Sequence, residues 1–190
     1  MTRQDMRPHL LGIDEGPFVK GQAEPVPLVA AVCEGADLLE SVALSAFPVD
    51  GDGATEFLAG WLGGLRVRAS LQGVALGGIT LAGLALVDLR ALSDALRVPV
   101  LAVTRRPPDN VRLREALEAA GLPERFAIAE RSPKAFATED GIWLAHAGIE
   151  RADALALLRA CRGKAKLPEA LRIAHLIATA LVRGESHGRV

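Results

Sequence analysis

The first third of the chain alternates short apolar runs with turn-forming residues, a pattern typical of β-strands. The apolar runs cover residues 10–13, 27–33 and 38–47. Only residues 34–37 separate the second run from the third, and connections this short join antiparallel neighbours. The pattern therefore predicts a meander of three antiparallel strands.

Beyond residue 53 the apolar residues recur every three or four positions, which is the period of an α-helix. Helices are predicted over residues 55–65, 81–96, 111–120, 150–162 and 168–183. Buried strands are predicted at residues 73–76 and 99–104, and a strand hairpin at residues 135–147. Thr55 is expected to cap the first helix, and residues 122–134 are expected to be irregular.

Three antiparallel strands followed by alternating helices and strands restrict the choice of fold. A Rossmann fold does not fit, because it alternates strand and helix from its first strand. A ribonuclease-H-like α/β fold does fit, because it joins a three-strand antiparallel meander to two parallel strands in one mixed sheet flanked by helices. A length of 190 residues suits a single domain of this kind, spanning residues 1–190.

The amino-acid composition limits the class of protein and the cellular compartment in which it is expected. Half of the residues are hydrophobic and 24% are charged, which is ordinary for a soluble globular protein. The net charge of −1 lacks the basic surplus of a non-specific nucleic-acid binder, so any such contact would come from a local patch. We find no signal peptide and no membrane-length apolar run, and the two cysteines lack zinc-ligand spacing. We therefore expect a cytoplasmic protein with no membrane partner.

Carboxylates at two places are the first candidates for chemistry. Asp14 ends the first predicted strand, and the carboxyl ends of strands are where α/β sheets gather ligand-binding groups. By position alone, an aspartate that turns the chain is an equal alternative. Asp50 and Asp52 lie in a glycine-rich loop, where two carboxylates could converge on one hard cation, although a solvated turn suits the same residues.

Later polar residues offer a metal ligand and phosphate contacts. His175 and Arg172 share a polar stripe of the last predicted helix, and their functional interpretation is a metal ligand and a phosphate contact. On amphipathicity alone, an ordinary solvated face is favoured. Gly77, Gly78 and Thr80 follow a predicted strand, and backbone N–H groups there could face a phosphate. The segment lacks the lysine of a P-loop and the GxGxxG order of a dinucleotide site.

Six segments carry a resemblance to a known family. They are LLGIDEGPF, FPVDGDGAT, LGGITLAGLALVDL, VPVLAVTRRPPD, HAGIE and PEALRIAHLIATALVRGESHGRV. Together they span nearly the whole chain and resemble the DUF99, or UPF0215, family of small archaeal and bacterial proteins. This family has been proposed as endonuclease dU, a relative of endonuclease V in the ribonuclease-H-like superfamily.

The resemblance to endonuclease V implies a metal site. Its first strand carries a metal-binding aspartate and its closing segment, similar to PEALRIAH, carries another metal ligand. These positions correspond to Asp14 and His175, and the acidic loop corresponds to Asp50 and Asp52. The resemblance thus implies Mg²⁺ or Mn²⁺ held by Asp14, Asp52 and His175, with Asp50 as a ligand or an outer-shell base.

The implied activity is endonucleolytic hydrolysis of a phosphodiester bond near a deaminated base such as uracil or hypoxanthine, in DNA or, as the less favoured alternative, in RNA. The tail residues Glu185, His187 and Arg189 belong to the last matching segment and are expected to fold over the site. Two departures favour an alternative. Gly77 stands where endonuclease V has a third metal carboxylate, and Gly53 stands where some relatives have a second aspartate. The alternative is a binding module for nucleic acid or nucleotides, of the same fold, with impaired catalysis.

Overall fold

The computed structural model describes residues 7–187 of the chain. Its first three strands are β1 (His9–Glu15), β2 (Val26–Glu34) and β3 (Leu38–Phe47). They pair in this order as an antiparallel meander, so the predicted meander is confirmed. In this register Asp14 pairs with Val29 and Val29 pairs with Leu44, which puts these three side chains on one side of the sheet.

The sheet continues with strands parallel to β1. β4 (Gly73–Leu76) lies beside β1, and β7 (Val100–Thr104) lies beside β4. β9 (Trp143–Ala147) and β8 (Phe136–Ala137) are antiparallel and complete the order β3-β2-β1-β4-β7-β9-β8. The predicted hairpin therefore joins the main sheet. The carboxyl ends of β1, β4 and β7 meet along one edge, where sheets of this class bind ligands.

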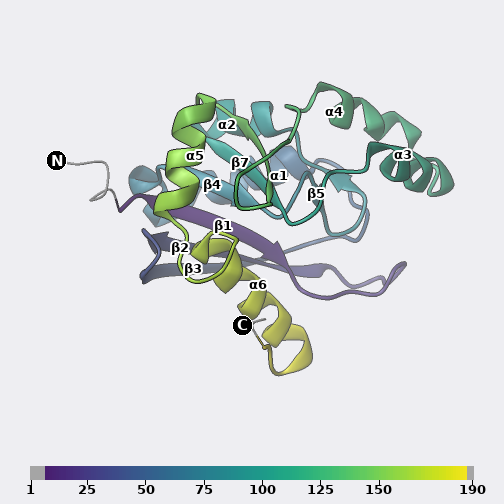
Figure 1. Cartoon of the computed structure of the whole chain (residues 1–190). Helices are drawn as coiled ribbons and strands as arrows, with labels where there is room; N and C mark the ends of the chain where they lie inside the picture. Colours follow the sequence, from purple (N-terminus) through teal and green to yellow (C-terminus); the bar gives the residue numbers. More distant parts are fainter. Residues whose placement is uncertain (1–6, 188–190) are drawn as a thin grey trace.

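Helices cover both faces of the sheet (Figure 1). On one face, α1 (Ala54–Gly63) and α2 (Leu89–Leu96) pack over the largest apolar cluster. On the other face, α5 (Arg151–Ala160) and α6 (Glu169–Arg183) pack over two further clusters, with α6 lying on β1 and β2. This arrangement is the mixed α/β architecture of the ribonuclease-H-like fold.

A smaller layer extends beyond the sheet, to the right in Figure 1. It consists of α3 (Asn110–Ala119) and α4 (Phe126–Arg131), packed around buried Leu86, Leu117 and Phe126. Two short 3₁₀ helices also occur, at Arg66–Ser70 and Pro123–Arg125. Within residues 7–187, no helix has both the length and the apolar character needed to cross a membrane.

Three segments differ from the sequence-based expectation. Residues 80–86 form a small hairpin, β5 (Thr80–Leu81) and β6 (Ala85–Leu86), because Ala82 and Gly83 between them take positive φ angles. The following helix therefore begins only at Leu89. Thr55 lies inside α1 and accepts a hydrogen bond from the Asp88 backbone N–H instead of capping the helix. The chain over residues 122–134, expected to be irregular, contains α4.

Candidate active site

The site is centred on a contact between Asp14 and His175. Asp14 stands near the carboxyl end of β1, and His175 lies in the middle of α6. The Nδ1 atom of His175 is 2.6 Å from Oδ2 of Asp14, a short hydrogen bond in which the imidazole donates. A histidine held by a carboxylate in this way is typical of metal ligands.

A glycine allows the helix to lie this close to the strand. Gly12 precedes Asp14 by two residues, on the same side of β1. A Cβ atom at Gly12 would come within 2.3 Å of the backbone nitrogen of Leu171 in α6. Any larger residue would push α6 away from β1. The missing side chain at Gly12 therefore lets His175 reach Asp14.

The two partners differ in exposure. The Asp14 side chain is 23% exposed, whereas that of His175 is 61% exposed. Burial raises the pKa of Asp14, while the charge and hydrogen bond of His175 act in the opposite direction. The other carboxylate oxygen of Asp14 accepts a hydrogen bond from the Glu15 backbone N–H at 3.0 Å. Both oxygens of Asp14 thus have partners, and the outer side of the imidazole faces solvent.

Glu15 belongs to the same site, although the sequence pattern did not single it out. It lines both of the hollows that Asp14 lines. Burial, and secondly the charge of Asp14, raise the pKa of Glu15 to about 7. The sequence feature that could have pointed to Glu15 is a pair of adjacent carboxylates at the end of an apolar strand. Such a pair places two acidic groups side by side next to the buried part of the protein.

Three hollows follow one another along the carboxyl edge of the parallel strands. The histidine hollow, of about 690 Å³, is lined by Asp14, Glu15 and His175 among others. The central hollow, of about 90 Å³, shares Asp14 and Glu15 with it and adds Gly77 and Gly78. The third hollow, of about 530 Å³, shares Gly77 and Gly78 with the central hollow, and we call it the Trp143 pocket. Their shared residues join the three hollows into one row.

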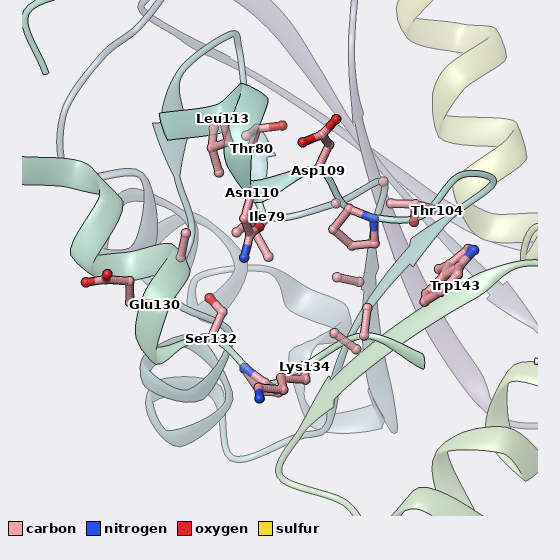
Figure 2. Close-up of a pocket in the computed structure, with 18 residues that line it drawn as sticks. Ile79, Thr80, Thr104, Asp109, Asn110, Leu113, Glu130, Ser132, Lys134 and Trp143 are labelled. Carbon is pink, nitrogen blue, oxygen red and sulfur yellow. The ribbon is translucent and has the colours of Figure 1, made fainter. Parts of the chain in front are cut away.

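The Trp143 pocket combines small apolar residues with polar side chains (Figure 2). Ala102 of β7 and Ala145 of β9 leave room above the sheet. Figure 2 shows Asn110 and Ser132 on one side of the pocket and Trp143 on the opposite side. Pockets of this volume, with a few convergent polar groups, are typical of sites for small molecules or for single groups of a larger ligand.

The two loop aspartates make contacts of their own. Asp50 takes a φ angle of 52°, and its Oδ1 accepts the Leu84 backbone N–H at 2.7 Å, so it fastens the loop to the β5–β6 hairpin. Asp52 lines a different pocket together with Arg125 and Arg131. The expected convergence of Asp52 with Asp14 and His175 is therefore not seen, and its role as an ion ligand stays a prediction.

The remaining candidates lie as follows. Gly77, Gly78 and Thr80 line the central hollow, and Glu185 and His187 line the histidine hollow. Arg172 pairs with Glu169 one helical turn earlier, with Nε 2.8 Å from Oε2. Arg189 lies outside the described residues.

Asp14, Glu15 and His175 are the described residues best placed to hold a cation, but they do not form a closed cage. Within residues 7–187, no group of three or more His, Cys, Asp or Glu side chains is arranged to hold an ion. The donors fit an ion of the Mg²⁺ type, which takes one or two carboxylates and completes its shell with water and phosphate oxygens. They do not fit a structural zinc site, which needs four protein ligands.

Comparison with known proteins identifies the family. The family model for endonuclease dU matches residues 7–182. A UPF0215 protein of Methanothermobacter thermautotrophicus is 35% identical over 183 residues, covering 94% of this chain and 90% of that protein. A UPF0215 protein of Deinococcus radiodurans is also 35% identical over 183 residues, covering 95% of this chain and 92% of that protein.

Solved structures share the fold of this chain. A protein of unknown function from Archaeoglobus fulgidus matches with a TM-score of 0.84 and 28% identity, covering 94% of this chain and all of that one. Endonuclease V of Streptomyces avermitilis matches with a TM-score of 0.58 and 14% identity, covering 94% of this chain and 83% of that one. At this lower identity the likeness shows the fold. The chain belongs to the endonuclease dU family, also called UPF0215, and shares its ribonuclease-H-like fold with endonuclease V.

Proposed function

We propose that this protein is a metal-dependent endonuclease of DNA repair that hydrolyses a phosphodiester bond near a deaminated base such as uracil or hypoxanthine. The contact between Asp14 and His175, at one end of the row of hollows, carries this proposal. Membership of the endonuclease dU family supports a nuclease. An endonuclease V of Ciona intestinalis, which shares the fold at 11% identity, was solved with DNA that contains an inosine followed by a ribo-adenosine, which supports a nucleic-acid strand as the ligand.

Asp14 and His175 would hold Mg²⁺ or Mn²⁺ between them. A bound ion of this kind polarises the phosphoryl oxygen and lowers the pKa of a coordinated water. Without an ion, the hydrogen bond to Asp14 keeps the imidazole oriented. Glu15, whose pKa of about 7 lies close to neutral pH, would accept a proton from water at its carboxylate.

The Trp143 pocket would receive the base after the base has turned out of the strand. Deamination replaces an amine with a carbonyl, so a pocket tells the two bases apart by donors and acceptors in fixed places. Asn110 and Ser132 supply such groups, and the ring of Trp143 on the opposite side supplies apolar surface for the base. Lys134, at the same pocket, would contact a neighbouring phosphate.

Cleavage of labelled strands tests this proposal. Strands that contain one uracil or one hypoxanthine are incubated with the protein and Mg²⁺ or Mn²⁺, and unmodified strands serve as the substrate control. We expect Asp14→Asn and His175→Ala to lose cleavage. A matched control is His9→Ala, because His9 at the opposite end of β1 also pairs with a carboxylate, its Nε2 lying 2.8 Å from Glu40. Equal cleavage by Asp14→Asn and the unchanged protein would refute the proposal.

A second function, binding of nucleic acid without cutting, is favoured by one observation. Gly77 carries no carboxylate, and an added Cβ there would meet no atom within 4 Å. Binding that persists in EDTA, with no cleavage in either metal, would select this function. Metal-dependent cleavage that Asp14→Asn removes would exclude it.

A cytoplasmic location belongs to the same proposal. Cys33 and Cys161 are free and buried, and burial raises their pKa to about 11 and about 12. Free buried thiols of this kind fit a reducing compartment.

A further inference from the structure

The histidine hollow is larger than the proposed ion needs. Its volume is about 690 Å³, whereas an ion with a shell of six waters occupies about 180 Å³, at about 30 Å³ for each water. The hollow continues from Asp14 and His175 along α6 to Thr179 and Arg183. These three helix residues are spaced four apart and therefore share one face of α6. Most of the hollow is thus left for a group other than the ion.

The opposite wall of the hollow is the loop that follows β1. This loop contributes Gly16, Pro17 and Phe18. Gly16 lets the loop lie against the end of α6, because an added Cβ there would come within 2.7 Å of Cγ2 of Val182 and 3.0 Å of the backbone oxygen of Ala178. The half-buried ring of Phe18 packs against the largest apolar cluster and also lines the hollow. The packing of the loop thus fixes the position of the ring beside α6.

Arg183 lines this hollow without a carboxylate partner. The other three arginines of α5 and α6 all have partners. Arg151 stacks on the ring of Phe136, whereas Arg159 and Arg172 each pair with a glutamate. Within residues 7–187, no ion pair forms at Arg183. An arginine that no carboxylate neutralises is available for a phosphate group.

Phe18 is likewise an aromatic ring without a partner. The chain has five Phe, two Trp and no Tyr. Most of these rings contact another ring or an arginine, namely Phe47, Phe57, Trp61, Phe126 and Phe136. In the part of the chain that the structure describes, Phe18 and Trp143 make neither contact, and they line opposite ends of the row of hollows. Free aromatic faces are where the bases of a single strand stack.

We infer that the histidine hollow is a second nucleotide subsite, in which the ring of Phe18 stacks on a base and the guanidinium of Arg183 binds a phosphate. That the ligand is a nucleic-acid strand rests on the proposed function. The subsite takes the part of the strand that lies beyond the ion from the Trp143 pocket, because Asp14 belongs to the hollows on both sides. From His175 to Arg183 the helix rises about 12 Å, or about three nucleotides of stacked strand at about 3.4 Å each.

Arg183 also has a structural role that the test must separate from phosphate binding. An arginine in the last turn of a helix stabilises that helix through its macrodipole. Arg159 occupies the same place in α5 and lines a separate pocket. Arg159→Gln is therefore the matched control for Arg183→Gln, since both remove one positive charge from the end of a helix.

Binding of a labelled strand at several salt concentrations tests the phosphate contact. Fluorescence anisotropy follows single strands that contain one uracil, in EDTA and at about 50–200 mM salt. Arg183→Gln removes one phosphate contact, so the slope of log affinity against log salt should become shallower by about 0.7. Arg159→Gln should keep the wild-type slope.

The same assay tests the stacking contact. Phe18→Leu keeps an apolar side chain against the cluster but removes the flat ring, and it should weaken binding about fivefold without changing the salt slope. Its matched control is Phe136→Leu, because Phe136 is also half-buried but packs against the cluster under α5. This control should keep the wild-type affinity.

An unchanged slope in Arg183→Gln, or a wild-type affinity in Phe18→Leu, would overturn the inference, and so would a wild-type protein that binds no strand. Circular dichroism establishes that each variant is folded. If Phe18→Leu does not fold, the slope of Arg183→Gln decides alone, because Arg183 is exposed at the end of α6. Strand binding with both expected losses but no cleavage in either metal would end the proposed function and keep the subsite. Cleavage with an unchanged slope in Arg183→Gln would end the subsite alone.

Discussion

Replacing Gly12 with alanine separates His175 from Asp14 without touching either residue. The new Cβ would lie 2.3 Å from the backbone nitrogen and 2.5 Å from the Cα of Leu171, where ordinary contact begins at 3.4 Å. These atoms are backbone atoms, so α6 has to retreat by about 1 Å. That retreat takes the 2.6 Å contact between His175 and Asp14 beyond hydrogen-bonding range.

The stability change expected for Gly12→Ala follows from this clash. Overpacking a well-packed core costs about 1–3 kcal/mol, and we expect the upper end because a whole helix must shift. The matched control is Gly60→Ala in α1, where a Cβ would meet no atom within 4 Å. That change should stabilise the protein by about 0.5–1 kcal/mol, because alanine favours the helix.

Denaturant unfolding measures both variants, with an unchanged m-value as the sign that the comparison is sound. The cleavage assay then reports the site, and Gly12→Ala should lose activity while Gly60→Ala keeps it. Suppose that the free energy of unfolding of Gly12→Ala lies within about 0.5 kcal/mol of that of the unchanged protein, and that the variant cleaves the strand equally fast. The close crossing of α6 over β1 then does not build the site.

Three further changes have defined outcomes. Folding raises the pKa of Glu15 from 4.5 to about 7, so the folded state binds the proton of this carboxyl group more tightly than the unfolded state does. The free energy of unfolding, measured in EDTA, should therefore fall as the pH rises from 4.5 to 7. Urea unfolding should show a fall that approaches about 3 kcal/mol, and Glu15→Gln should abolish it. An equal pH dependence in Glu15→Gln would show that Glu15 is not its cause. Gly77→Asp adds a carboxylate beside Asp14, because the preceding residues Ile13 and Leu76 pair in the parallel register. Calorimetry should then show that Mn²⁺ binds about tenfold more tightly. An unchanged affinity would mean that the new carboxylate does not reach the ion. Arg106→Ala, in the loop between two lining residues of the Trp143 pocket, should lower the salt dependence of DNA binding by about one unit of slope. An unchanged slope would remove this loop from the DNA interface.

Much of the fold follows from periodicity, because strands and helices differ in the spacing of their apolar residues. The meander and the parallel strands were predictable for this reason. The hairpin over residues 80–86 was not, because it depends on a left-handed conformation at Ala82, which alanine rarely adopts and which the surrounding structure imposes. The helical spacing of the apolar residues there continues into α2 and masks the turn.

Two residues of the candidate site were predictable from their positions in the sequence, one at the end of a strand and the other on the polar face of a helix. Asp14 and His175 met these conditions, although their contact also needed the glycine at position 12. Asp52 could not be placed from the sequence. Its direction depends on the positive φ of Asp50, whose side chain bonds to Leu84 in a distant hairpin.

Adding Mn²⁺ to isotope-labelled protein, while following the broadening of its amide NMR signals, locates the ion directly. Asp14, Glu15 and His175 should broaden first, and His175→Ala should remove this effect while His9→Ala leaves it in place. Broadening centred on Asp52 and its neighbours, or broadening at Asp14 that His175→Ala does not change, would show that Asp14 and His175 do not share the ion.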